Sequence, residues 1–124
     1  MKKLFFVCLL MLAGSAWAEW VVYSKTEEDG TFYLDPATIR KDGNMRRVWL
    51  LRNFNQRNKD GAMSNRNRME IDCKQERFRF LALSTHSEPM AGGTVLTQEG
   101  EANNWMAIPP NTTAETIFNL VCAK

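Results

Sequence analysis

Hydrophobic and polar residues alternate along much of the chain, and a period of two residues is that of a β-strand with one buried face. The alternation is clearest in residues 64–73. One face of this stretch is apolar and the other is charged: Met69, Ile71 and Cys73 against Arg66, Arg68, Glu70 and Asp72. The pattern predicts a strand whose apolar face, with Cys73 at its end, points into the core.

Residues 77–86 repeat this alternation directly after the first strand, and Lys74-Gln75 forms a tight loop between the two. One register pairs apolar residues with each other and opposite charges with each other: Asp72 with Arg77, Ile71 with Phe78, Glu70 with Arg79 and Met69 with Phe80. Cross-strand pairs of these kinds stabilise an antiparallel sheet. We therefore predict an antiparallel hairpin in this register.

Four more stretches have the length and composition of strands: residues 20–25, 31–35, 45–56 and 94–98. Asp35-Pro36 is typical of a helix start, so one helical turn is predicted there, and residues 41–44 indicate a turn. Residues 105–111 have no clear period, and their two prolines end any strand or helix. Up to this point the chain predicts a mostly antiparallel sheet.

Residues 112–122 change to the period of a helix. Apolar residues occupy the positions of one helical face: Ala114, Ile117, Phe118, Val121 and Cys122. Thr112 and Glu115 have the spacing of a capping box, and Leu120 lies outside the apolar stripe. The sequence therefore predicts an α+β fold in which a C-terminal helix packs on one face of the sheet.

Residues 1–18 have the pattern of a secretory signal peptide, with two lysines, an apolar run and the cleavage signal Ala16-Trp17-Ala18. A helix over residues 4–18 would span about 22 Å, too short for a hydrocarbon core of about 30 Å, so no membrane-spanning segment is expected. Ser15 stands where a lipoprotein signal needs a cysteine. We expect cleavage before Glu19, one domain over residues 19–124, and an exported protein, periplasmic or secreted, without a lipid anchor.

The cysteines predict a disulfide bond. Cys8 leaves with the signal peptide, so Cys73 and Cys122 remain, and both are predicted to face inward. In an oxidising compartment two such thiols form one disulfide, which would tie the last turn of the helix to the sheet. A zinc site is disfavoured because structural zinc takes four ligands and His86 is the only histidine. We expect no metal and no cofactor.

Charge is balanced over residues 19–124, with 14 basic and 14 acidic side chains, but residues 40–79 hold 12 basic and 5 acidic ones. A neutral exported domain is not expected to bind nucleic acid. The candidate ligand-binding residues lie on the outer face of the sheet and suit an anionic glycan or an acidic protein patch: Arg66, Arg68, Arg77 and Arg79. The alternative, which we favour, is a solvated face whose arginines are partly neutralised by Glu70 and Asp72.

Residues of the types used in catalysis gather at the end of one strand: Ser84, His86, Ser87 and Glu88. Neighbouring strand residues point to opposite faces, and no nucleophile-elbow motif surrounds Ser84. We therefore expect no enzymatic activity. The large aromatic residues are expected to fill the core: Trp20, Trp49, Trp105, Phe54, Phe78, Phe80 and Phe118.

Seven segments in order resemble the surface-adhesin protein E family of bacterial envelope proteins: WVVYSK, FYLDPATI, VWLL, EIDC, MAGGTV, WMAIPP and the terminal VC. The resemblance covers nearly all of the chain after residue 18. It implies a roughly six-stranded antiparallel sheet, with a C-terminal helix on its concave face tied there by a disulfide at Cys73 and Cys122. It also implies binding of host matrix proteins such as vitronectin and laminin.

Two functions follow from these observations. The first is a non-catalytic exported binding module for a host matrix protein or an anionic glycan. The second is a structural or accessory protein of the periplasm with no host ligand, which Ser15 favours. Exposure of the protein on whole cells discriminates between them.

Overall fold

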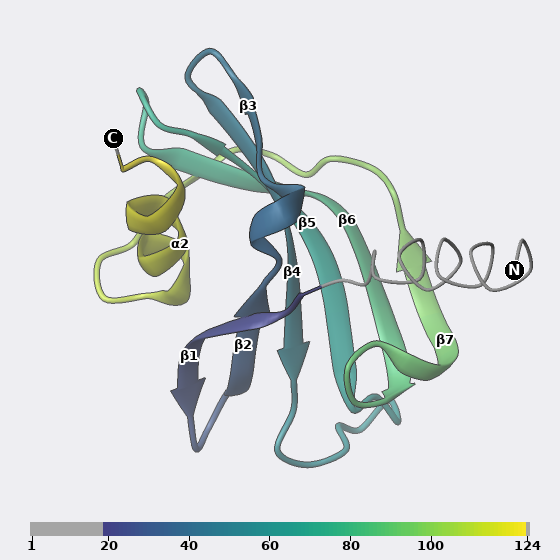
Figure 1. Cartoon of the computed structure of the whole chain (residues 1–124). Helices are drawn as coiled ribbons and strands as arrows, with labels where there is room; N and C mark the ends of the chain where they lie inside the picture. The colour runs from purple at the N-terminus through teal and green to yellow at the C-terminus, as the bar shows by residue number, and fades with distance from the viewer. Residues whose placement is uncertain (1–18, 124) are drawn as a thin grey trace, which may run out of the picture.

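The computed structural model describes residues 19–123, which form one antiparallel sheet and one C-terminal helix (Figure 1). The strands are β1 (Val21–Thr26), β2 (Gly30–Leu34), β3 (Arg40–Asp42), β4 (Met45–Asn53), β5 (Ser64–Asp72), β6 (Arg77–Glu88), β7 (Gly92–Glu99) and β8 (Met106–Ala107). A 3-10 turn, η1 (Pro36–Thr38), follows β2, and the helix is α2 (Thr113–Val121). Within the described range, length and hydropathy identify no membrane-crossing helix. The predicted signal peptide, residues 1–18, lies outside the described residues.

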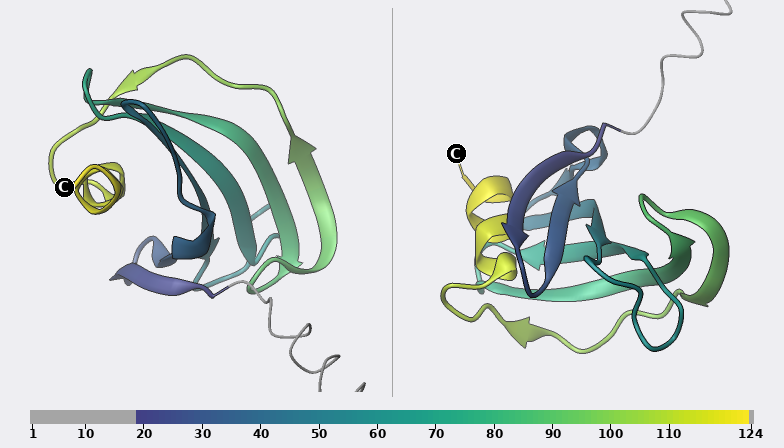
Figure 2. Two further views of the ribbon diagram at one scale, coloured as in Figure 1. Left: turned by 45° about the horizontal axis from the view of Figure 1, so that its top comes forward. Right: turned by 90° about the horizontal axis from the view of Figure 1, so that it is seen from below.

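Six strands form the body of the sheet in the order β1-β2-β4-β5-β6-β7, and neighbours are antiparallel. The six-stranded antiparallel sheet is thus confirmed. β3 and β8 pair only with parts of β4 and β6 and were not predicted. Residues 41–44 had indicated only a turn, and β8 has too few residues to show a period. Figure 2 shows the sheet strongly curled, with α2 on its concave side.

The β5–β6 hairpin has the predicted register, with Asp72 opposite Arg77, Ile71 opposite Phe78, Glu70 opposite Arg79 and Met69 opposite Phe80. The carboxylate oxygen Oδ1 of Asp72 accepts hydrogen bonds from the backbone N–H groups of Lys74 (3.1 Å) and Gln75 (3.0 Å). These bonds hold the loop between the strands. The charged partner of Arg77 is therefore also the residue that shapes the turn.

Irregular strand pairings redirect side chains at two places that matter below. Leu81 is an extra residue in β6, opposite the step from Arg68 to Met69 in β5. Tyr23 is an extra residue in β1, and its ring lies 6.1 Å from that of Phe32. Bulges of this kind increase the local twist of a sheet and turn side chains to the other face. They account for part of the curl and for the inward position of Tyr23.

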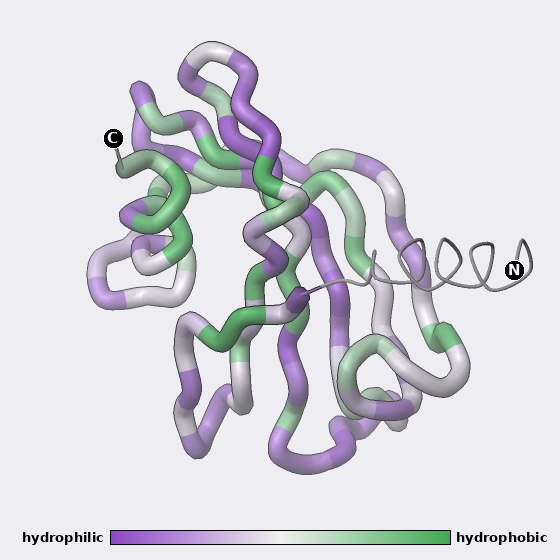
Figure 3. Tube along the Cα trace, viewed as in Figure 1, coloured by the Kyte–Doolittle hydropathy of each residue, from purple (hydrophilic) through white to green (hydrophobic). Residues whose placement is uncertain are grey.

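The core lies between α2 and the concave side of the sheet. Its buried residues are Leu34, Val48, Leu50, Met69, Ile71, Phe78, Ala114, Ile117 and Val121. Figure 3 shows the same division, with hydrophobic segments on α2 and a hydrophilic loop between β4 and β5. The expectation that large aromatic residues fill the core is right for Phe78, and Phe80 and Phe118 pack at its margin. It is wrong for the tryptophans, which are not part of the core cluster.

The N-terminal end of α2 is capped nearly as predicted. The hydroxyl oxygen of Thr112 accepts a hydrogen bond from the backbone N–H of Glu115 (3.3 Å). The Glu115 carboxylate accepts from the backbone N–H of Asn111 (3.2 Å) and not from that of Thr112. The capping box is thus shifted by one residue, and two helix-start donors are still satisfied.

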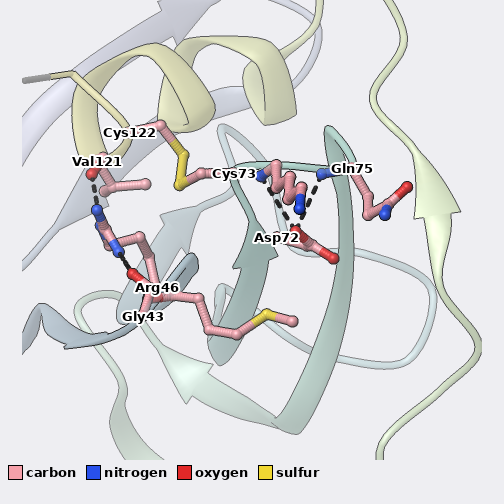
Figure 4. The surroundings of a disulfide bond; sticks show 9 residues. Gly43, Arg46, Asp72, Cys73, Gln75, Val121 and Cys122 are labelled. Atoms are coloured by element: carbon pink, nitrogen blue, oxygen red, sulfur yellow. Dashed lines mark hydrogen bonds between the residues drawn. A yellow bond between two sulfur atoms is a disulfide. The ribbon is translucent and has the colours of Figure 1, made fainter.

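The last turn of α2 is held to the sheet by two contacts (Figure 4). Cys122 forms the predicted disulfide with Cys73, with their Cα atoms 5.7 Å apart. The Nε of Arg46 donates a hydrogen bond to the carbonyl oxygen of Val121 (3.1 Å), and its Nη1 donates to that of Gly43 (2.9 Å). Because a helix C-terminus attracts cations, Arg46 caps α2 and does not belong to the basic outer face.

We predict that Cys73→Ser and Cys122→Ser each lower the free energy of unfolding by similar amounts. The bond spans 49 residues, and closing such a loop is worth about 4 kcal/mol in the chain-entropy model. The double variant should be no less stable than either single variant, because all three lack the same bond. Urea denaturation measures the loss, with reduced and alkylated protein as the reference. Free thiols at both positions in unreduced protein would contradict the bond.

Candidate binding faces of the sheet

The convex side of the sheet carries all four arginines predicted as a binding site: Arg66, Arg68, Arg77 and Arg79. Along β5 these positions alternate with Met69 and Ile71, which face α2 on the concave side. Across the convex face, Arg68 lies opposite Trp49, and Glu70 lies between Arg47 and Arg79. The structure thus brings the predicted residues to one face, where their partners differ.

Arg77 and Arg79 are engaged in ion pairs with buried carboxylates. Arg79 donates to Glu70 at 2.8 Å, and Arg47 donates to the other oxygen of Glu70 at 2.8 Å. Arg77 lies 3.1 Å from the Asp72 carboxylate. Glu70 and Asp72 are each only 3% exposed. The expectation that these carboxylates lie on a solvated face is therefore wrong, because the arginines and Trp105 cover them.

Trp105 lies over both of these arginines. Its ring centre is 4.5 Å from the guanidinium carbon of Arg77 and 4.4 Å from that of Arg79. Stacking of this kind favours the cationic form and shields the ion pairs beneath from water. Trp105 precedes β8, which pairs with the start of β6 and so brings the ring to this position. Together these residues form an ion-pair cluster in which buried carboxylates neutralise the arginines.

The carboxylates of this cluster are held in their charged form. Burial alone would raise the pKa of Glu70, but hydrogen bonds from Arg47 and Arg79 outweigh burial and hold that pKa below its usual range. The backbone N–H of Gln75, helped by Arg77, lowers the pKa of Asp72 against the effect of burial. Both carboxylates therefore stabilise the fold above pH 4–5 and lose this contribution as they are protonated in acid.

Arg66 and Arg68 are different, because neither forms an ion pair or a side-chain hydrogen bond with another residue in the range 19–123. Arg66 is exposed, and its guanidinium carbon lies 4.7 Å from the ring centre of Trp49. Trp49 thus supports an arginine on the convex face instead of filling the core. The pair Arg66 and Arg68, with Trp49 beside them, is the part of the predicted site that remains free to bind an anion. We call these three residues the convex basic patch.

The residues considered for catalysis come together only in part. The Ser84 hydroxyl and His86 Nε2 are 2.8 Å apart, as their shared face allows, but the two residues are only 8% and 6% exposed. The Nδ1 of His86 has no hydrogen-bond partner in the described chain, so no carboxylate orients the ring. Burial, with a smaller effect of Arg66, lowers the pKa of His86. Ser87 accepts a hydrogen bond from the backbone of Thr94 instead.

Within residues 19–123, the second imidazole nitrogen of His86 has no orienting partner. A triad requires an orienting group on the second imidazole nitrogen and a path for substrate to the hydroxyl. Ser64, which lies opposite His86, is tied to the β6–β7 turn, since its Oγ donates to the Glu88 carbonyl (2.6 Å) and accepts from the backbone N–H of Ala91 (3.0 Å). No group of three or more metal-ligating side chains assembles anywhere in residues 19–123.

A second candidate site lies on the concave side and was not predicted. A cavity of about 400 Å³ is lined by residues from β1, β2, β4, β5, β6, β7 and the start of α2. Asn65 and Asn67 line it from β5. Both lie on the same inward face of β5 as Met69 and Ile71, which are apolar. Polar residues at these inward positions are the sequence feature that could have indicated the cavity.

We predict that Glu70→Gln lowers the free energy of unfolding by about 2 kcal/mol at pH 7, because it leaves Arg47 and Arg79 without their carboxylate. Glu76→Gln in the exposed β5–β6 loop is the control and should change little. As pH falls through about 4, this glutamate is protonated in the unfolded chain before it is protonated in the folded one, where its pKa is lowered, so the difference should shrink. Urea denaturation at pH 7 and pH 3 tests this. An equal loss at both pH values would show that the lost hydrogen-bond acceptor, and not the charge of Glu70, matters.

Comparison with known proteins agrees with this fold. No curated protein sequence matches the chain. Two solved structures of Haemophilus influenzae protein E are similar, one at 14% identity over 88% of this chain and 87% of that chain with a TM-score of 0.67, and crystal form II at 17% over 74% and 80% with a TM-score of 0.62. A family model described as surface-adhesin protein E matches residues 20–123. The chain therefore belongs to the surface-adhesin protein E family.

Proposed function

We propose that the protein is a non-catalytic, exported binding module that holds an acidic segment of a host matrix protein, or an anionic glycan, on its convex basic patch. The observation that carries this proposal is that, among residues 19–123, Arg66 and Arg68 have no carboxylate partner, whereas Arg77 and Arg79 are paired with carboxylates in the cluster beneath Trp105. Membership of a family described as surface adhesins supports a binding role. The proposed site is thus half of the one predicted from the sequence.

The patch has the chemistry that an anionic partner needs. A planar guanidinium binds carboxylate or sulfate groups with two parallel hydrogen bonds. Trp49 adds an aromatic surface of the kind found at the centres of binding interfaces. In this protein its ring also supports the guanidinium group of Arg66. Because Arg66 is exposed and Arg68 is partly exposed, salt should weaken their attraction to an anion, with a screening length of about 8 Å at physiological ionic strength.

Processing forms part of the same proposal. We infer that residues 1–18 are removed before Glu19 and that residues 19–124 act as one domain, since the small-x-small signal and the disulfide both fit an oxidising compartment. Ser15 in place of the cysteine of a lipoprotein signal supports an unlipidated form. Intact mass and N-terminal sequencing of protein purified from the envelope test this. An N-terminus other than Glu19, or a mass that includes acyl chains, would contradict it.

The second candidate function is a structural or accessory role in the periplasm without a host ligand. Ser15 favours it, because an unlipidated protein is not held at the membrane. Protease shaving and antibody binding on whole cells separate the two candidates. Accessibility supports adhesion, and protection on intact cells combined with cleavage after permeabilisation supports the periplasmic role.

We predict that Arg66→Glu combined with Arg68→Glu weakens binding to immobilised vitronectin, laminin or heparin at least about tenfold, the effect of losing roughly 1.4 kcal/mol. The melting temperature should barely change, since neither arginine makes an ion pair in the folded chain described here. Lys25→Glu combined with Lys59→Glu is the matched control, because it changes the net charge equally at exposed residues elsewhere.

The wild-type affinity should also fall as salt increases, and surface plasmon resonance across a salt series measures both effects. Full binding by the Arg66 and Arg68 double variant would exclude the convex basic patch. Equal loss in the lysine control would show that net charge, and not this patch, attracts the ligand. Absence of wild-type binding to all three probes would leave the periplasmic role as the better explanation.

A further inference from the structure

The concave cavity is positioned by the curl of the sheet and by the short length of α2. The helix covers the end of the concave side where Val48, Ile71 and Phe78 lie (Figure 2). Beyond its first residue, Thr113, the concave surface continues across the sheet as a cavity of about 400 Å³. This volume lies in the range of small-molecule sites, which is about 300–1,000 Å³.

The cavity has an apolar floor and aromatic walls. Leu50 and Met69 are buried in its floor, at 3% and 4% exposure. Phe32 and Phe80 are half-buried and line it from β2 and β6, with Leu83 beside Phe80. Aromatic rings that face open space beside a core provide flat apolar surface for a ligand. A ligand that fits here therefore needs at least one apolar face.

Two asparagines that line the cavity have buried side-chain oxygens without partners. The Oδ1 atoms of Asn65 and Asn67 are buried, and neither accepts a hydrogen bond from another residue in the described range. The Tyr23 hydroxyl makes no hydrogen bond within that range either, and burial raises the pKa of Tyr23. Unsatisfied buried polar groups are rare, and each calls for an explanation. Two of them, on residues that line one cavity, point to a ligand that supplies the missing partners.

The charges around the cavity restrict the kind of ligand. Arg52 is already engaged, since its Nε donates to the carbonyl oxygen of Asp29 (2.7 Å) and its guanidinium stacks on Phe32. Glu99 and Glu101 lie at the opposite rim, are exposed and form no ion pair within residues 19–123. The interior thus offers uncharged hydrogen-bonding groups, and the rim is acidic. An anionic ligand is disfavoured there, in contrast to the convex basic patch.

We propose that the concave cavity binds a neutral saccharide, in a site separate from the convex basic patch. A pyranose ring has apolar C–H faces that pack on aromatic rings such as those of Phe32 and Phe80, and hydroxyl groups around its edge. Each hydroxyl donates and accepts, as does an acetamido substituent, so both can pair with the side-chain amides of Asn65 and Asn67. Glu99 and Glu101 accept hydroxyl hydrogen bonds at the rim and repel carboxylated sugars.

The first experiment is a titration of ¹⁵N-labelled protein, residues 19–124, followed by NMR. The probes are N,N′-diacetylchitobiose and lactose as neutral sugars, with N-acetylneuraminic acid as the anionic comparison. We expect weak binding, about millimolar, of a neutral sugar, with shifts concentrated at the Asn65 and Asn67 side-chain amides. No shift at these amides with either neutral sugar would overturn the proposal. Stronger binding of the anionic sugar would overturn it as well.

The second experiment uses Asn65→Leu combined with Asn67→Leu, which keeps the number and branching of the side-chain heavy atoms and removes the hydrogen-bonding groups. We expect sugar affinity to fall about tenfold or more, as for the loss of a buried hydrogen bond. The melting temperature should stay the same or rise, because two unsatisfied polar groups are removed from a buried surface. Loss of fold would be seen by circular dichroism. Leu83→Trp, which narrows the cavity and keeps both amide side chains, then serves as the second variant.

The Arg66→Glu and Arg68→Glu variant is the matched control, since it should bind neutral sugar normally. The two proposals therefore fail separately: each double variant should lose one ligand and keep the other. Pull-down on insoluble cell-wall glycan and on desialylated mucin distinguishes a bacterial from a host source. Retention on either that is lost in the asparagine variant supports the proposal. Retention that the variant keeps, or absence of retention on both, contradicts it.

Discussion

The structure depends on one apolar interface, the burial of the α2 stripe against the concave side of the curled sheet. Ile117 is fully buried there, and Val121 nearly so, against Val48 and Ile71. A helix of nine residues is too short to be stable alone in water, so this burial and the Cys73–Cys122 bond hold it together. Because the helix covers only one end of the concave side, the same interface leaves the cavity beyond it.

Strand β5 shows how one period of two residues produces two unlike surfaces. Its inward residues change from apolar Ile71 and Met69 to polar Asn67 and Asn65, and this change marks where the core ends and the cavity begins. Its outward residues change from the buried carboxylates of the ion-pair cluster to the unpaired arginines of the convex basic patch. The two proposed sites are thus adjacent through the strand, with opposite charge preference.

The sequence predicted which face of the sheet carries the candidate site, but it did not predict which residues make up that site. Alternation placed Arg66, Arg68, Arg77 and Arg79 together, and cross-strand pairing already indicated neutralisation by Glu70 and Asp72. Nothing local indicated that Trp105 would lie over Arg77 and Arg79, because β8 brings it there from more than twenty residues away in the chain. The cavity depends on the Tyr23 bulge and on the extent of α2, which are likewise set by packing.

The sequence by itself determined the antiparallel hairpin of β5 and β6, the cap and apolar stripe of α2, and the disulfide. The reason is that these follow from short periods, from cross-strand charge pairs and from the presence of two inward cysteines. Tertiary structure decided where the bulges fall, which aromatic residues leave the core, which arginines remain unpaired and where the concave side stays open. Those features depend on which of several distant segments packs against a given surface. Because such long-range packing does not produce a periodic pattern in the sequence, it could not be predicted from the chain alone.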